Sequence, residues 1–156
     1  MKGEKNKKMS FSDRELLARI ILCEAGGEGE NGMKAVATVV MNRVNVQTGE
    51  YFRVSEGGNI RNIIFQKNQF TCAIENISNM PNMRSIYTVS PDQVHFEIAD
   101  WAISGNKLNE VGECLWFMNP GNKDCGLYFP PNQSGIFHTR VNQHCFFRPT
   151  EKYNTT

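Results

Sequence analysis

The sequence has no long apolar run and no strong excess of charge of either sign. No stretch approaches the ~18 consecutive apolar residues of a membrane-spanning helix. The first ten residues are polar and lack the apolar centre of a signal peptide. The net charge is +1, too small to produce the field that attracts nucleic acid. We therefore expect no membrane span, no signal peptide and no nucleic-acid partner, with synthesis in a cytoplasm.

Metal-binding spacings are also missing. The five cysteines include no CxxC pair and the three histidines no HExxH pattern. An odd cysteine count fits neither a complete disulfide framework nor a zinc ribbon. We therefore expect packed thiols, no metal and no cofactor, although a site built from His138, His144 and Cys145 stays open. Cys125 and Cys145 are expected to lie close together, with or without a disulfide between them.

The order of local patterns predicts an α+β fold. The 156 residues are long enough for one domain with a real core, and residues 1–9 form a basic tail that we expect to be disordered. The folded domain is then 10–156, with a small antiparallel sheet at its C-terminal end. Expected helices lie at 13–24, 32–45, 59–65 and 91–104, expected loops at 26–32, 46–59 and 120–134, and expected strands at 114–119, 136–141 and 144–147.

Capping and turn residues indicate where some of these helices and strands begin or end. The last predicted helix has Ser90 as its cap, Pro91 in its first turn and Gln93 closing a capping box. The last two strands are joined through Asn142, a residue type that tolerates the positive φ of a tight turn.

Glu24 is the strongest candidate for chemistry. Its helix starts at Ser12, with Glu15 placed to close a capping box, and Leu17, Ile20 and Ile21 form its apolar stripe. Glu24 continues that stripe, so its carboxyl lies in line with the buried face and at the partly negative end of the helix. Both conditions favour the neutral acid and predict a raised pKa. Such a carboxyl is suited to general acid catalysis.

Four blocks of sequence resemble the spore cortex-lytic cell-wall hydrolases of the SleB/CwlJ type. The first follows the pattern E-A-x-G-E-x-x-x-G-x-x-A-V-A-x-V-x-x-N-R-V over 24–44. The others are Phe65-Gln66 with Gln69-Phe70, then Leu115-Trp116-Phe117 with Asn119-Pro120, and finally His144-Cys145-Phe146-Phe147 with Pro149-Thr150. The blocks cover about 12–150 in the order of the family. The absent signal peptide, Asp124-Cys125, His144-Cys145 and Tyr153-Asn154-Thr155 place the chain nearer the coat-associated CwlJ branch.

The resemblance implies cleavage of peptidoglycan glycan strands in the spore cortex during germination, by a lytic transglycosylase or a muramidase. It implies a lysozyme-like use of Glu24 on the first helix and a location at the spore coat or the coat–cortex boundary, with coat proteins as partners. The turn after Cys23 is also similar to the catalytic region of resuscitation-promoting factors, which have a lysozyme-like fold.

Other residues extend the expected site. Glu28 is the nearest second carboxylate, either as a catalytic group or as a structural brace. Amide groups and rings suited to sugars complete the substrate-binding set: Gln66, Asn68, Gln69, Phe70, Trp116 and Asn119. Core packing is an equal alternative for Trp116. Asn42 and Arg43 are expected to tie their helix to the loop that positions Glu24.

Two other functions remain as alternatives. A zinc-dependent peptidoglycan amidase would need a histidine-rich ligand set. A non-catalytic glycan-binding spore coat protein would not need the acid, which this sequence has as Glu24.

Overall fold

Helices occupy the first two thirds of the chain and strands the last third, as the sequence predicts. The computed structural model describes residues 10–130 and 132–156, so the predicted tail at 1–9 lies outside the described residues. The helices are α2 (Asp13–Ala25), α3 (Gly29–Asn45), α4 (Gly49–Ser55), α5 (Ile60–Ile64) and α6 (Gln93–Ile103), with 3-10 turns η1 (Thr71–Ala73) and η2 (Glu151–Thr155). The strands are β1 (Asn76–Ile77), β2 (Met80–Pro81), β3 (Trp116–Met118), β4 (Tyr128–Phe129), β5 (Gly135–Val141) and β6 (His144–Pro149).

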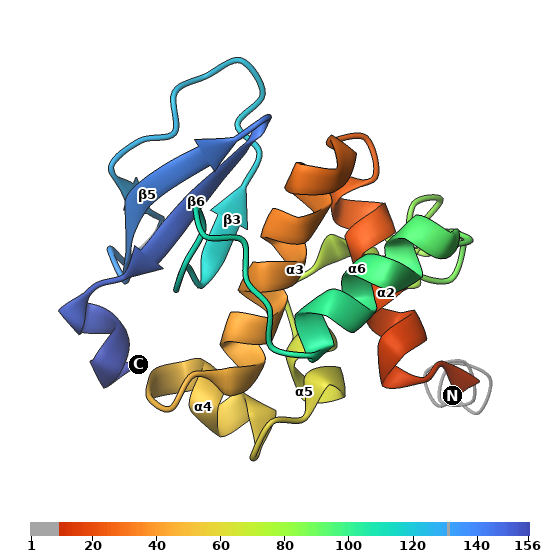
Figure 1. The fold of residues 1–156 in the computed structure, drawn as a ribbon, viewed down its shortest axis with the longest axis horizontal. Coiled ribbons are helices and arrows are strands. Elements are labelled where there is room, and N and C mark those ends of the chain that lie inside the picture. Colours follow the sequence, from red (N-terminus) through yellow and green to blue (C-terminus); the bar gives the residue numbers. More distant parts are fainter. Residues whose placement is uncertain (1–9, 131) are drawn as a thin grey trace.

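Helix α3 is the centre of the molecule. It lies between the sheet and the pair formed by α2 and α6 (Figure 1). The α2 stripe predicted from the sequence is buried, and Leu17, Ile20 and Ile21 have no exposed surface. Val36 and Val40 of α3 are equally buried in the same core. The helix that carries Glu24 is therefore held on its apolar side by α3 and α6.

The C-terminal sheet has the order β3-β6-β5-β4, and all its neighbours are antiparallel. Trp116 of β3 pairs with Phe147 of β6, and a register shift falls between Phe137 and Thr139 of β5. The tight turn between β5 and β6 has Asn142 at φ 52°, which confirms the predicted role of that residue. A disulfide joins Cys125, in the loop before β4, to Cys145 of β6, with Cα atoms 5.7 Å apart.

Several predicted boundaries are wrong for identifiable reasons. The expected loop 46–59 contains α4, because Tyr51 is buried and its N–H donates to the Tyr153 hydroxyl from the other end of the chain. The expected loop 120–134 contains β4, which pairs with β5. Helix α3 begins at Gly29, inside the expected loop 26–32. These elements depend on partners that are distant in sequence.

The predicted capping boxes also need correction. Ser12 does accept a hydrogen bond from the Glu15 N–H, but the Glu15 side chain pairs with Arg19 instead of closing the box. The N-cap of α6 is Asp92 rather than Ser90, and His95, not Gln93, closes its box by accepting from the Asp92 N–H at 2.9 Å.

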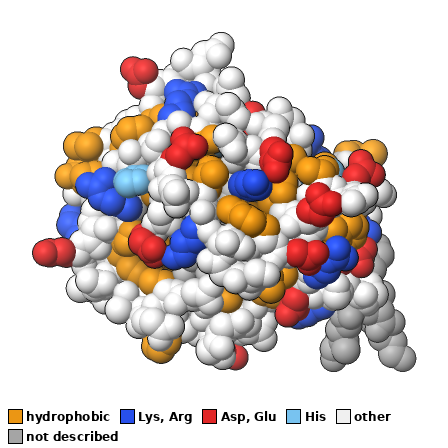
Figure 2. All heavy atoms as spheres, viewed as in Figure 1, with side chains coloured by type: hydrophobic (Ala, Val, Ile, Leu, Met, Phe, Trp, Pro, Cys, Tyr) orange, Lys and Arg blue, Asp and Glu red, His pale blue; other side chains and the backbone are white. Residues whose placement is uncertain are grey.

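Within the described ranges, no helix is both long and apolar enough to cross a membrane. Figure 2 shows acidic and basic side chains interspersed on one face of the molecule, in keeping with the net charge of +1.

Candidate active site

A cleft of about 790 Å³ lies where the helices meet the sheet. Its walls come from the end of α2, from α3, from η1 and the segment leading into it, from the residues after β2, and from strands β3, β4 and β6. The described residues that line it are Cys23, Glu24, Arg43, Asn68, Gln69, Phe70, Thr71, Cys72, Asn82, Arg84, Phe117, Met118, Asn119, Phe129, Pro130 and His144. Among them, Glu24 is the sole carboxylate.

The pKa of Glu24 is raised, chiefly because burial removes its carboxyl from water. The positive charges of Arg43 and Arg84 and the backbone N–H of Cys72 act in the opposite direction and limit the rise. The raised pKa favours the protonated form that a proton donor needs, and the arginine charges and the Cys72 N–H would stabilise the anion left after donation. The sequence argument anticipated the direction of the shift and its main cause.

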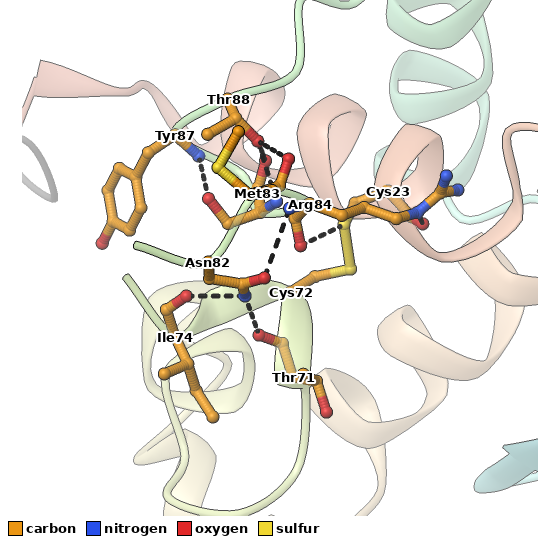
Figure 3. Close-up of a disulfide and its surroundings, with 10 residues drawn as sticks. Cys23, Thr71, Cys72, Ile74, Asn82, Met83, Arg84, Tyr87 and Thr88 are labelled. Atoms are coloured by element: carbon orange, nitrogen blue, oxygen red, sulfur yellow. Dashed lines mark hydrogen bonds between the residues drawn. A yellow bond between two sulfur atoms is a disulfide. The ribbon is translucent and has the colours of Figure 1, made fainter. Parts of the chain in front are cut away.

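A disulfide joins Cys23, the residue before Glu24, to Cys72 (Figure 3). It joins the end of α2 to η1, with Cα atoms 6.2 Å apart. Arg84 reaches the same place, and its Nε donates to the Cys23 carbonyl at 2.9 Å. The expectation of packed thiols is thus wrong for Cys23 and Cys72. Cys125 and Cys145 do lie close together, as predicted, and are bonded to each other, which leaves Cys114 as the free cysteine. The odd number of cysteines therefore corresponds to two disulfides and one buried free cysteine.

Arg43 and Gln69 form the floor of the cleft. The Arg43 guanidinium lies over the Phe70 and Tyr51 rings, 5.1 and 4.7 Å from their centroids. Gln69 Oε1 accepts from the Tyr51 hydroxyl at 2.9 Å and from Arg43 Nη1 at 3.4 Å. Because two donors hold its oxygen, the Gln69 amide NH₂ is left to donate to a ligand.

Asn42 and Arg43 also bind backbone carbonyls, but not in the predicted place. Asn42 Nδ2 donates to Gly112 and Cys114, and Arg43 Nε donates to Leu115 at 2.6 Å. They therefore fasten α3 to the segment that enters β3, rather than to the loop after Glu24.

The structure brings four of the six expected substrate-binding residues into the cleft: Asn68, Gln69, Phe70 and Asn119. Gln66 is not among the lining residues, and its Nε2 donates to Glu50 Oε1 at 3.0 Å. Trp116 is 7% exposed and packs against Tyr51, Phe129 and Tyr153. Of the two alternatives for Trp116, its position is that of core packing.

Glu28 does not line the cleft. Its Oε1 accepts from the Gln143 N–H at 2.8 Å and lies 2.9 Å from His144 Nδ1, while its backbone carbonyl accepts from Asn142 Nδ2. The turn between α2 and α3 is therefore fastened to the turn between β5 and β6. This geometry fits the structural alternative for Glu28.

The described part of the chain contains no ligand set for the zinc-dependent alternative. Cys145 is bonded to Cys125, His138 is exposed on β5, and His144 is paired with Glu28. No three His, Cys, Asp or Glu side chains of residues 10–130 and 132–156 are grouped to hold a metal ion.

Sequence reasoning missed Asn82, Arg84, Cys72 and His144 as cleft residues. Asn82 and Arg84 lie in a segment with no periodic pattern. Asn82 Nδ2 donates to the carbonyls of Thr71 and Ile74, which fixes that segment against η1 (Figure 3). His144 stood in a block that resembles the family, and this was the only sequence signal for it.

The sequence pattern of the cell wall hydrolase family matches residues 27–147, and the chain belongs to that family. Glu24 lies three residues before the matched segment. The chain is also similar to proteins named cell wall hydrolase CwlJ. It is 27% identical to the one from Bacillus subtilis, over 92% of this chain and 94% of the relative. It is 25% identical to the one from Halalkalibacterium halodurans, over 88% of this chain and 86% of the relative.

Solved structures with the same fold include two SleB catalytic domains. The Bacillus cereus domain has a TM-score of 0.62 and 22% identity, covering 87% of this chain and 89% of that one. The Bacillus anthracis domain, described as a germination-specific lytic transglycosylase, has a TM-score of 0.60 and 22% identity. The likeness covers 88% of this chain and 97% of that one. At this identity the likeness concerns the fold, which is that of the SleB catalytic domain.

Proposed function

We propose that this chain cleaves the glycan strands of spore-cortex peptidoglycan during germination, with Glu24 as general acid. The observation that carries the proposal is a carboxyl with a burial-raised pKa on the wall of a cleft of about 790 Å³. Amide groups of Asn68, Gln69 and Asn119 line the same cleft and suit the hydroxyl and N-acetyl groups of a glycan. Membership of the cell wall hydrolase family supports the choice of substrate.

The lining of the cleft favours transglycosylation over hydrolysis. Two-carboxylate glycosidases need a second Asp or Glu to act as nucleophile or to activate water, and Glu24 is the sole carboxylate among the described lining residues. In a transglycosylase the substrate supplies its own nucleophiles. The name of the Bacillus anthracis SleB domain, a lytic transglycosylase, points the same way.

The proposed reaction uses Glu24 twice. Its proton passes to the bridging oxygen as the bond from that oxygen to C1 breaks, and the leaving sugar departs as an alcohol. The N-acetyl oxygen stabilises the electron-poor C1 until the 6-hydroxyl oxygen of the same sugar bonds to it. The hydroxyl proton then passes to the Glu24 carboxylate, which restores the acid. The product has a 1,6-anhydro end, and no water is consumed.

A spore location outside the reducing cytoplasm is part of the proposal. The two disulfides support it, since such bonds persist in oxidising surroundings. We expect the protein to work at the coat or the coat–cortex boundary, held there by coat proteins.

Digestion of purified cortex sacculi, analysed by mass spectrometry, tests the reaction. We expect anhydromuramic ends that are absent after digestion with the Glu24→Gln protein. Reducing muramic ends would replace transglycosylation by hydrolysis. Free stem peptides would overturn glycan cleavage in favour of an amidase, and intact sacculi with bound protein would indicate a glycan-binding coat protein.

A further inference from the structure

His144 lines the cleft and has no part in the proposed reaction. We propose that His144, oriented by Glu28, contacts the glycan and accepts a hydrogen bond from one of its hydroxyl or N-acetyl N–H groups. This inference rests on the proposed function, because it names a substrate-recognition residue of the same cleft.

Glu28 determines which ring nitrogen of His144 carries the proton. Glu28 Oε1 lies 2.9 Å from His144 Nδ1 and also accepts from the Gln143 N–H. A carboxylate oxygen only accepts, so Nδ1 is the donor of this pair. In the neutral imidazole the proton is therefore on Nδ1, and Nε2 is left with a lone pair.

The ring is fixed in place and lines the cleft. His144 is 5% exposed, and its ring lies edge-on to Phe117 with centroids 5.5 Å apart and packs against Phe146 at 6.3 Å. No hydrogen bond joins Nε2 to any of the described residues. A nitrogen acceptor on a ring that packing holds rigid is suited to recognition, because little side-chain entropy is lost when a ligand binds.

Glu28 is itself held by its surroundings. Its backbone carbonyl accepts from Asn142 Nδ2, so both its side chain and its backbone bind the turn between β5 and β6. Gly32 lies directly against it, and a side chain at that position would clash with the Glu28 Cβ. Glu28 is therefore a positioning residue that acts through His144 and does not reach the cleft.

The chemistry of the cleft explains why an acceptor is useful there. Arg43 and Arg84 are donors only, and Gln69 has its oxygen occupied and its NH₂ free. A glycan strand offers hydroxyl and N-acetyl N–H donors as well as acceptors. His144 Nε2 supplies an acceptor for these donors on the sheet side of the cleft, where β6 begins.

Binding, measured in the inactive Glu24→Gln protein, tests the inference independently of cleavage. The probe is a peptidoglycan tetrasaccharide, titrated by calorimetry. Asparagine at position 144 keeps a donor near Nδ1 but removes Nε2, whereas glutamine places an amide near Nε2. We expect His144→Asn to weaken binding about tenfold, equivalent to ~1.4 kcal/mol, and His144→Gln to stay within about threefold of the parent. Equal affinity of the His144→Asn variant and the parent would overturn the proposal.

Two Glu28 variants show whether Glu28 affects glycan binding by positioning His144 or through its negative charge. Glu28→Gln keeps an acceptor for both N–H donors and should bind nearly as the parent does. Glu28→Leu removes that acceptor and should weaken binding about as much as His144→Asn. If Glu28→Leu binds as tightly as the parent while remaining folded, Glu28 does not position His144.

A readout on the unaltered His144 keeps the test independent of variant folding. Nitrogen-15 NMR of the imidazole should show a proton on Nδ1 in the free Glu24→Gln protein and a shift of the Nε2 resonance on addition of the tetrasaccharide. An unmoved Nε2 resonance in the saturated complex would contradict the proposal. A moved resonance combined with sacculi that stay uncleaved by the wild type would retain this inference and remove the proposed function.

Discussion

Burial of the Glu24 carboxyl raises its pKa, which suits the proposed role as general acid but costs stability at higher pH. The folded protein binds the proton more tightly than the unfolded chain, because burial raises the pKa of Glu24 above its ordinary value. Its contribution to stability is complete below the unfolded pKa of about 4.3 and is lost as the pH rises through the higher folded pKa. As the pH rises toward neutrality, the wild type therefore loses stability at this position.

Glu24→Gln should consequently lose activity and gain stability. The amide keeps the size of the side chain but cannot deliver a proton, so cleavage should fall by ~10²–10⁴-fold. The melting temperature should exceed that of the wild type at pH 7, and the difference should shrink toward pH 4. A variant that retains more than about a tenth of the wild-type turnover would contradict the role of Glu24 as the acid.

Arg84 gives a separate test of the same carboxyl, because its charge lowers the pKa of Glu24. Arg84 is exposed, so its replacement should leave the core intact. A general acid must be protonated, and activity should fall as the pH rises through the pKa of Glu24 in the enzyme–substrate complex. Arg84→Gln removes a positive charge and should move this alkaline limb to higher pH, whereas Arg84→Lys should leave it nearly in place. Movement of the limb to lower pH in Arg84→Gln would be inconsistent with this electrostatic account.

Cys114 should be chemically inert in the folded protein. Burial raises the pKa of its thiol to about 12, and thiolate is the reactive form. Native protein should therefore gain no mass on treatment with iodoacetamide. Unfolded but unreduced protein should gain one adduct, and unfolded reduced protein five, because two disulfides protect the other four cysteines. More than one adduct before reduction would show that a disulfide is absent.

At the scale of elements, the Cys23–Cys72 disulfide links the helix that carries the acid to the segment that forms a cleft wall. Cys72 also contributes a backbone N–H near the Glu24 carboxyl. The bridge spans 49 residues, and loss of such a link costs roughly 2–4 kcal/mol. Its loss should therefore affect both stability and the geometry around Glu24.

The Cys125–Cys145 bridge offers a matched control. The double variant Cys23→Ser/Cys72→Ser should melt at a lower temperature and lose at least about tenfold in activity at a temperature where it is still folded. Cys125→Ser/Cys145→Ser should also melt earlier but keep most of its activity, since its bridge does not touch Glu24. Equal activity losses in the two folded variants would mean that the first bridge has no special role at the site.

Elements with local signals could be predicted from the sequence, and elements with distant partners could not. Helix α2 has both a cap at Ser12 and an apolar stripe, so it was placed within one residue of its observed end. Helix α4 is only seven residues long, without an extended apolar stripe, and is held by Tyr51 against Tyr153, about a hundred residues away. A contact between residues so far apart in sequence produces no periodic pattern from which it could be predicted.

The candidate site likewise contains residues that the sequence predicts and residues that only the folded structure brings together. The position of Glu24 is predicted by helical spacing, that of Gln69, Phe70 and Asn119 by the blocks that resemble the family, and that of Asn68 by its amide group beside one of those blocks. The position of Arg84 depends on how the segment after β2 folds back onto α2, and the Cys23–Cys72 pairing depends on how η1 meets the end of α2. Glu28 and His144 are 116 positions apart, so only the folded chain shows that they act together.

At the scale of the whole molecule, the residues assigned to the proposed reaction line a cleft between the helices and the sheet. Among the described residues, no cluster of His, Cys, Asp or Glu is arranged as a metal site, and the thiol of Cys145 is engaged in a disulfide. Cleavage of cortex sacculi should therefore proceed unchanged after dialysis against EDTA. Loss of more than about half of the activity, restored by one divalent metal, would contradict this expectation and return attention to the zinc-dependent alternative.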